Sequence, residues 1–151
     1  RPPTLLATML RTDVRVGTST PKADPSGDYA WLLFRKAEAV QAGAYAALDA
    51  KALMLTGGAD SPKPPAGRGT YAWVMDRGQA DVFLTYCTNA VSAQQEVPRL
   101  KIVQVPPELQ VGAAYGLTLR GDAPPAARAF VAHLLSAEGR AVLQRYGFGA
   151  P

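Results

Sequence analysis

Cysteine and histidine, the usual ligands of structural zinc, are almost absent from this chain. Its 151 residues include one cysteine and one histidine. A structural zinc site needs about four ligands and a disulfide needs a pair of cysteines, so both are excluded. No apolar run reaches the roughly eighteen residues that a membrane-spanning helix requires. The sequence therefore predicts neither a metal site nor a transmembrane segment.

Charge of one sign is not concentrated anywhere either. The 16 basic and 12 acidic residues give a net charge of +4 and alternate along the chain. No stripe of lysine and arginine with interleaved aromatic residues is present, so no nucleic-acid partner is predicted. The mild positive balance is compatible with a small anionic ligand. With 48% apolar residues, the chain is long enough to form one domain, or one domain with an appendage.

Apolar periodicity and turn residues predict a chain that alternates between strands and helices. Strands are predicted at 14–17, 53–56, 82–86, 101–105 and 113–119. Helices are predicted at 4–10, 28–42, 44–51, 70–77, 88–95, 124–135 and 136–146. This order favours an α/β fold with a mostly parallel sheet covered by helices. In such sheets ligands bind at the carboxyl ends of the strands, here after Gly17, Thr56 and Tyr86.

The segment Asp24–Asp28 joins a predicted strand to a predicted helix. The first backbone N–H groups of a helix have no partner within it, and the helix dipole adds partial positive charge there. Gly27 would let a ligand approach the backbone and Ser26 offers a hydroxyl donor, so an oxyanion fits this place. An ordinary capped turn, with Ser26 or Asp28 as the N-cap, explains the same residues equally well.

The run Gly67–Ala72 matches the pattern G-x-G-x-x-A of dinucleotide-binding proteins. A proline-rich loop precedes it instead of a strand, so we reject the nucleotide interpretation. The helix start at Gly69 still offers a second group of amides to an anion. Arg68 would add positive charge there, although a lone arginine in a loop is more often simply solvated.

The remaining reactive side chains favour binding over catalysis. Tyr86 ends the most apolar predicted strand, where its phenol could donate to an anion or pack at the edge of the core. Cys87 is predicted to be a small buried residue, because the only imidazole, His133, lies on a distant predicted helix. No nucleophile elbow, P-loop or metal-ligand spacing occurs. We therefore expect no enzyme activity, no metal and no cofactor.

Three runs of the sequence resemble the molybdate-binding proteins of ABC importers. They are 17–30, with the motif D-P-S-G-D-Y-A, 82–90, with V-F-L-T-Y-C-T-N-A, and 130–148, which ends in R-Y-G-F. The resemblance implies a type II periplasmic binding fold, in which two α/β lobes close on a dehydrated tetrahedral oxyanion. It also implies binding by neutral donors, mainly hydroxyl and backbone N–H groups.

Carried onto this sequence, the resemblance implies roles for particular residues. Ser26 matches the small residue at the start of the second lobe's helix, Arg68 a backbone N–H donor, and Tyr86 a hydroxyl donor. The family often carries aspartate where Asn89 stands, and an arginine at 68 is unusual, which leaves the choice of anion open. The predicted ligand-binding residues are Ser26, Gly27, Arg68, Gly69, Tyr86 and Asn89.

The resemblance also divides the chain. Residues 1–13 are expected to lead in from a first lobe, 14–111 to form the second lobe, and 112–151 to return toward the first lobe as a strand and a helix pair. The first lobe's own segment would precede Arg1. Without it, the return helices would expose an apolar surface through which the chain could dimerise. The expected protein is periplasmic, binds molybdate or tungstate, and delivers the anion to an ABC permease in the inner membrane.

Two other functions are compatible with the same residues. One is an effector-sensing, anion-binding domain of a transcription regulator, because such domains share the lobe architecture. The other is an α/β enzyme that uses Cys87 as its nucleophile. A DNA-binding segment or a signal peptide ahead of this sequence would separate the regulator from the transport protein.

Overall fold

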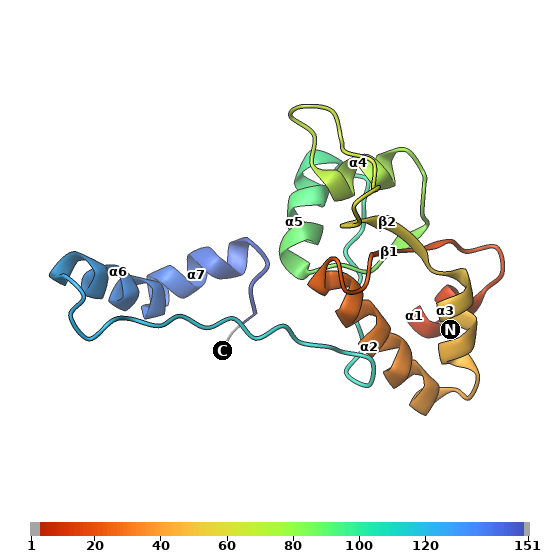
Figure 1. The fold of residues 1–151 in the computed structure, drawn as a ribbon, viewed down its shortest axis with the longest axis horizontal. Coiled ribbons are helices and arrows are strands. Elements are labelled where there is room, and N and C mark those ends of the chain that lie inside the picture. The colour runs from red at the N-terminus through yellow and green to blue at the C-terminus, as the bar shows by residue number, and fades with distance from the viewer. Residues whose placement is uncertain (1–3, 150–151) are drawn as a thin grey trace. The chain divides into compact units, whose positions relative to one another are not determined.

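The computed structural model describes residues 4–149, and the chain divides into two compact units, residues 1–112 and 113–151. Among the described residues, unit 1 contains five helices and three strands, and unit 2 contains two helices (Figure 1). In chain order the elements are α1 (Leu5–Leu10), β1 (Val16–Ser19), α2 (Pro25–Val40), α3 (Ala44–Lys51), β2 (Leu53–Thr56), α4 (Thr70–Asp76), β3 (Val82–Phe83), α5 (Cys87–Glu96), α6 (Pro125–Leu135) and α7 (Ala137–Arg145).

A three-stranded parallel sheet lies at the centre of unit 1, in the order β2-β1-β3. Gly17 of β1 pairs with Leu53 of β2 on one side and with Phe83 of β3 on the other. The connections between these parallel strands run through α2 and α3, and through α4. The predicted α/β fold with a parallel sheet flanked by helices is therefore confirmed.

The sheet is smaller than the sequence predicts, because 101–105 and 113–119 form no strand and 82–86 shortens to Val82–Phe83. A strand needs a neighbour for its N–H and C=O groups. Positions 106 and 107 are prolines, which have no N–H to continue a ladder. Residues 113–119 belong to unit 2, which offers no strand among its described residues. The predicted return strand is therefore wrong.

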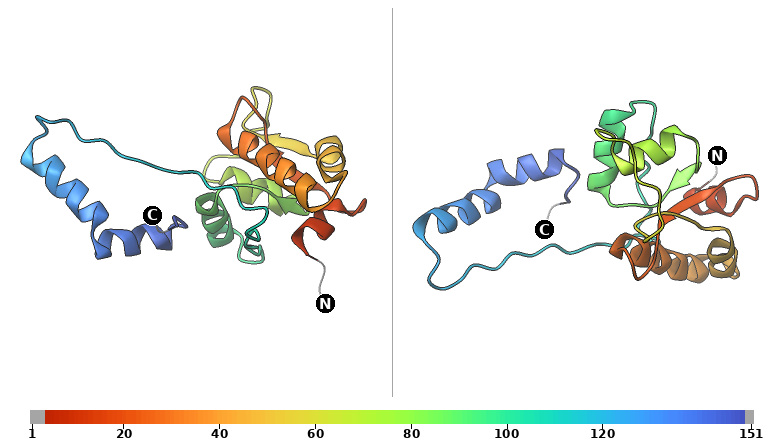
Figure 2. Two further views of the ribbon diagram at one scale, coloured as in Figure 1. Left: turned by 90° about the horizontal axis from the view of Figure 1, so that it is seen from below. Right: turned by 45° about the horizontal axis from the view of Figure 1, so that its top comes forward.

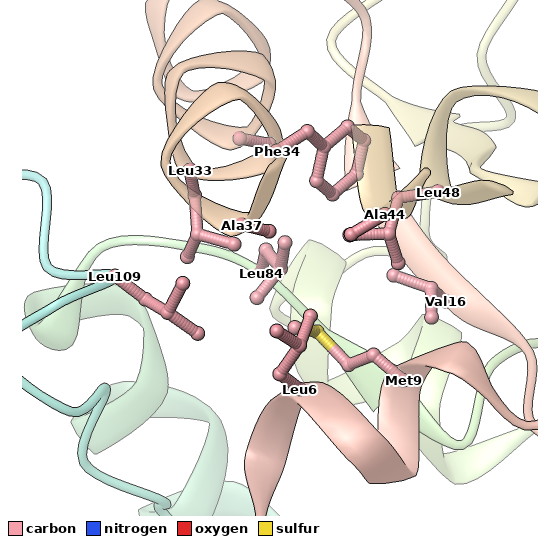
Figure 3. Close-up of a cluster of buried hydrophobic side chains, with 11 residues drawn as sticks. Leu6, Met9, Val16, Leu33, Phe34, Ala37, Ala44, Leu48, Leu84 and Leu109 are labelled. Atoms are coloured by element: carbon pink, nitrogen blue, oxygen red, sulfur yellow. The ribbon is translucent and has the colours of Figure 1, made fainter. Parts of the chain in front are cut away.

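The main hydrophobic core packs α1, α2 and α3 against the sheet (Figure 3). Phe34 of α2 and Met9 of α1 are fully buried in it. Leu109, which follows α5 at a distance in the chain, is buried in the same core, and Lys36 donates a hydrogen bond to the carbonyl oxygen of Gln110. These contacts fix α2 on β1, and with it the helix start at the carboxyl edge of the sheet.

A second and smaller hydrophobic cluster joins α4 to α5. Beside it, the ring of Tyr71 meets the ring of Phe83 edge-on with centroids 5.3 Å apart, which attaches α4 to β3. The cluster contains no large aliphatic or aromatic side chain that is fully buried. Its buried members are Ala72, Ala93 and Val97.

Unit 2 consists of α6 and α7, two helices joined by a tight turn (Figure 2). Ser136 ends α6 and caps α7, because its Oγ accepts the N–H of Gly139 at 3.1 Å. A Cβ at Gly139 would lie 2.1 Å from the carbonyl oxygen of His133, so this turn requires glycine. No residue of α6 is buried, and Phe130 and Leu135 are each 61% exposed. These two helices therefore leave apolar side chains uncovered.

Candidate functional site

The start of α2 follows β1 at the carboxyl edge of the sheet. Asp24 is its N-cap, because Oδ1 of Asp24 accepts the backbone N–H of Ser26 at 2.9 Å. The expectation that Ser26 or Asp28 caps this helix is wrong, since Pro25 takes the first helical position and loses no hydrogen bond there. Ser26 itself is buried. The amide of Ser26, which was expected to face an anion, already has a carboxylate acceptor.

Gly27 is required by the packing of the chain. A Cβ at this position would lie 2.6 Å from the backbone nitrogen of Pro21 and 2.7 Å from the carbonyl oxygen of Ser19. The loop over which it lies is fastened to β2, because the N–H and the hydroxyl of Thr20 both donate to the carbonyl oxygen of Thr56 at 2.9 Å. Hydrogen bonds and close packing thus hold the ends of β1 and β2 next to the start of α2.

The start of α5 adjoins the start of α2. Tyr86 is the N-cap residue of α5, and no side chain among the described residues caps this helix. The ring of Tyr86 meets the ring of Tyr29, in the second turn of α2, with centroids 5.9 Å apart and an angle of 67°. In the first turn of α5, Nδ2 of Asn89 donates to Oγ1 of Thr85 at 3.0 Å. The structure therefore brings together four predicted site residues: Ser26, Gly27, Tyr86 and Asn89.

The other two predicted site residues, Arg68 and Gly69, lie at the opposite end of α5. The N–H of Gly69 donates to Oε2 of Glu96 at 2.8 Å, and the guanidinium of Arg68 donates to the other oxygen of the same carboxylate. The backbone N–H of Arg68 donates to the carbonyl oxygen of Pro65 at 3.1 Å. The ten residues of α5 span about 15 Å, which separates this pair from Tyr86.

The carboxylates around Arg68 have lowered pKa values. The amide of Gly69 and the guanidinium of Arg68 lower the pKa of Glu96. Arg99 and Arg68 lower the pKa of Asp76, the last residue of α4. Both carboxylates are therefore ionised at neutral pH. An anionic solute at the start of α4 would have to displace a negative charge that already binds there.

Catalytic and metal chemistry has little support in the described structure. Cys87 is exposed, which corrects the prediction that it is buried, because α5 begins at this residue and buries only Ala93. His133 lies on α6 in unit 2. Within residues 4–149, no three His, Cys, Asp or Glu side chains gather as a metal ion would need. The helices of this part of the chain are also too short or too polar to cross a bilayer.

Comparison with known proteins decides the family. Residues 2–149 match the family of bacterial extracellular solute-binding proteins. The chain belongs to this family. This solute-binding protein is also 38% identical over 112 residues to the uncharacterised protein PM1146 of Pasteurella multocida (strain Pm70), an alignment that covers 74% of the chain and 46% of that protein. The chain thus spans about half the length of this curated relative. No solved structure matches the chain significantly.

Sequence reasoning missed two acceptors at helix starts of this solute-binding protein. Asp24 could have been found, because Asp-Pro ahead of an apolar periodic segment is typical of an N-cap followed by proline. Glu96 offered no local pattern, since it lies 27 residues from Gly69 and meets it through the packing of α5 on α4. Long-range packing thus determines which helix starts are occupied by the chain itself.

Proposed function

We propose that this lobe is part of the periplasmic solute-binding component of an ABC importer, and that it contacts molybdate or tungstate at the adjoining starts of α2 and α5. The contact between Tyr29 and Tyr86, with centroids 5.9 Å apart, carries this proposal because it places both starts together. They lie at the carboxyl edge of a parallel sheet, where α/β proteins bind ligands. Membership of the solute-binding family supports a binding role over a catalytic one.

Of the two helix starts, that of α5 is the better partner for an anion. The carboxylate of Asp24 already accepts a hydrogen bond at the start of α2, whereas α5 has no side-chain cap among the described residues. The N–H groups of Cys87, Thr88 and Asn89 have no acceptor within the helix, as in any first turn. A helix dipole favours negative charge at this end by about 0.3–1 kcal/mol. We propose that the hydroxyl of Tyr86, the N-cap residue of α5, donates to the same anion.

The proposed site is half of a larger one. A tetrahedral dianion takes roughly six charge-assisted hydrogen bonds, and one helix start with a tyrosine supplies about half of them. Arg68 and Gly69 would contribute only in a state in which Glu96 releases them. We propose that a second lobe supplies the other donors, in keeping with a relative about twice as long as the matched segment. The exposed apolar side chains of α6 would pack against that lobe.

Titration calorimetry of the full-length protein with molybdate, tungstate and sulfate tests the proposal. We expect at least one of these anions to bind, and Tyr86→Phe to weaken its binding by about 1–3 kcal/mol, or roughly 5- to 150-fold. Tyr45→Phe is the matched control, because Tyr45 lies on α3, which leads into the amino end of β2. Absence of binding by all three anions, or wild-type affinity of Tyr86→Phe, would refute the proposed site.

A further inference from the structure

α4 is too short to be stable by itself. It has seven residues, T-Y-A-W-V-M-D, whereas isolated helices shorter than about 12–15 residues are marginal in water. Most of these residues are β-branched or aromatic, or are aspartate, and have modest helix propensity. Its N-cap residue, Gly69, supplies no side-chain acceptor. The stability of α4 must therefore come from other parts of unit 1.

Charged side chains from one short segment contact both ends of α4. At the start, Oε2 of Glu96 accepts the N–H of Gly69 at 2.8 Å. At the end, Arg99 donates to the carbonyl oxygen of Asp76 at 3.1 Å and pairs with its carboxylate at 2.6 Å. Negative charge at a helix start and positive charge at a helix end are the arrangement that stabilises the helix dipole. Arg68 closes the ring by bonding both Glu96 and Asp76.

Apolar packing on α4 relies on small side chains, because Ala72 and Val74 are its buried residues and no larger side chain of α4 is buried. The buried cluster between α4 and α5 holds two alanines and one valine, Val97. Val97 lies between Glu96 and Arg99 in the sequence, so the same few residues supply the charges and the largest buried side chain of the cluster. The side chains of Glu96 and Asp76 are 29% and 32% exposed, so dissolved salt can reach them.

We propose that these four residues, Arg68, Asp76, Glu96 and Arg99, form an electrostatic clamp that keeps α4 folded. Weakening the clamp opens α4 locally while the rest of unit 1 stays folded. The clamp also reaches α5, because Glu96 is the last residue of that helix and Tyr86 precedes its first. This inference does not depend on the proposed solute, since it concerns the protein without ligand.

Hydrogen exchange of the full-length protein, measured peptide by peptide without any solute, tests the clamp. Glu96→Gln removes the negative charge, and Glu96→Ala removes the hydrogen-bond acceptor as well. Exchange in residues 70–77 should therefore rise about two- to fivefold, more in Glu96→Ala than in Glu96→Gln. Exchange in α2 should stay at its wild-type rate. Arg99→Lys keeps the positive charge, so exchange in residues 70–77 should stay near the wild-type rate. Arg99→Gln removes the charge and should raise that rate. About 1 M salt should speed exchange of the wild type in the same segment.

Arg11→Gln is the matched control, because Arg11 and Asp13 form an exposed ion pair between near neighbours in sequence. It should change exchange nowhere in 70–77. Wild-type exchange rates in the Glu96 variants and in high salt would overturn the clamp. An equal rise in α2 would also overturn it, since it would show a loss of global stability instead of local opening. If a Glu96 variant does not fold, the salt titration of the wild type decides the question alone.

Discussion

Two regions of unit 1 are held together by different forces. Around α1, α2 and α3, eleven buried apolar residues form one continuous core. Around α4 and α5, the buried apolar residues Ala72, Val74, Ala93 and Val97 are all small, and the charged ring of Arg68, Asp76, Glu96 and Arg99 supplements them. Apolar burial is insensitive to moderate salt, whereas partly exposed ion pairs are screened by it. The proposed site takes one helix start from each region.

Truncating one buried side chain in each region is the strongest test of this contrast. Phe34 is fully buried and packs on Trp31 with ring centroids 5.0 Å apart. Phe34→Ala should lower the free energy of unfolding by about 3–5 kcal/mol. Val97→Ala removes less buried surface and should lower it by about 1–2 kcal/mol. Urea denaturation measures both, and equal losses would show that the two regions do not differ in this way.

Acid should weaken the junction between the strands of the two regions. Arg15, which precedes β1, pairs with Asp81 before β3 at 2.9 Å, and this guanidinium, with the backbone N–H of Arg15, lowers the pKa of Asp81 to about 2. Because the folded pKa lies below the unfolded value, Asp81 stabilises the fold above pH ~4, and this contribution is lost as the pH falls toward ~2. The melting temperature of Asp81→Asn should therefore fall less steeply in this range than that of the wild type. Parallel curves would remove Asp81 from the junction.

Local sequence patterns predicted the elements that depend on local structure. α3 and β2 have their predicted bounds, because Gly43, with a φ of 84°, separates the helix from α2 and an apolar run of four residues follows it. The predictions of strands at 101–105 and 113–119 were wrong. A strand forms only beside a partner strand, and the local sequence pattern does not reveal whether a partner is present.

The same distinction applies to the candidate site. The motif D-P-S-G-D indicated the start of α2 to within a few residues, because capping residues are neighbours of the helix in sequence, but the N-cap is Asp24 and not Ser26 or Asp28. The separation of Arg68 and Gly69 from Tyr86 could not be predicted. It depends on the length of α5 and on the carboxylate of Glu96, which is distant from Gly69 in the sequence.

The most direct test of the central claim is a nitrogen–proton NMR titration of the full-length protein with molybdate. The amide resonances of Cys87, Thr88 and Asn89 should shift most, followed by those at the start of α2. Amides in the first turn of α3, at the other end of the sheet, should not move. Shifts confined to residues outside the starts of α2 and α5 would contradict the account, as would a spectrum that the anion leaves unchanged.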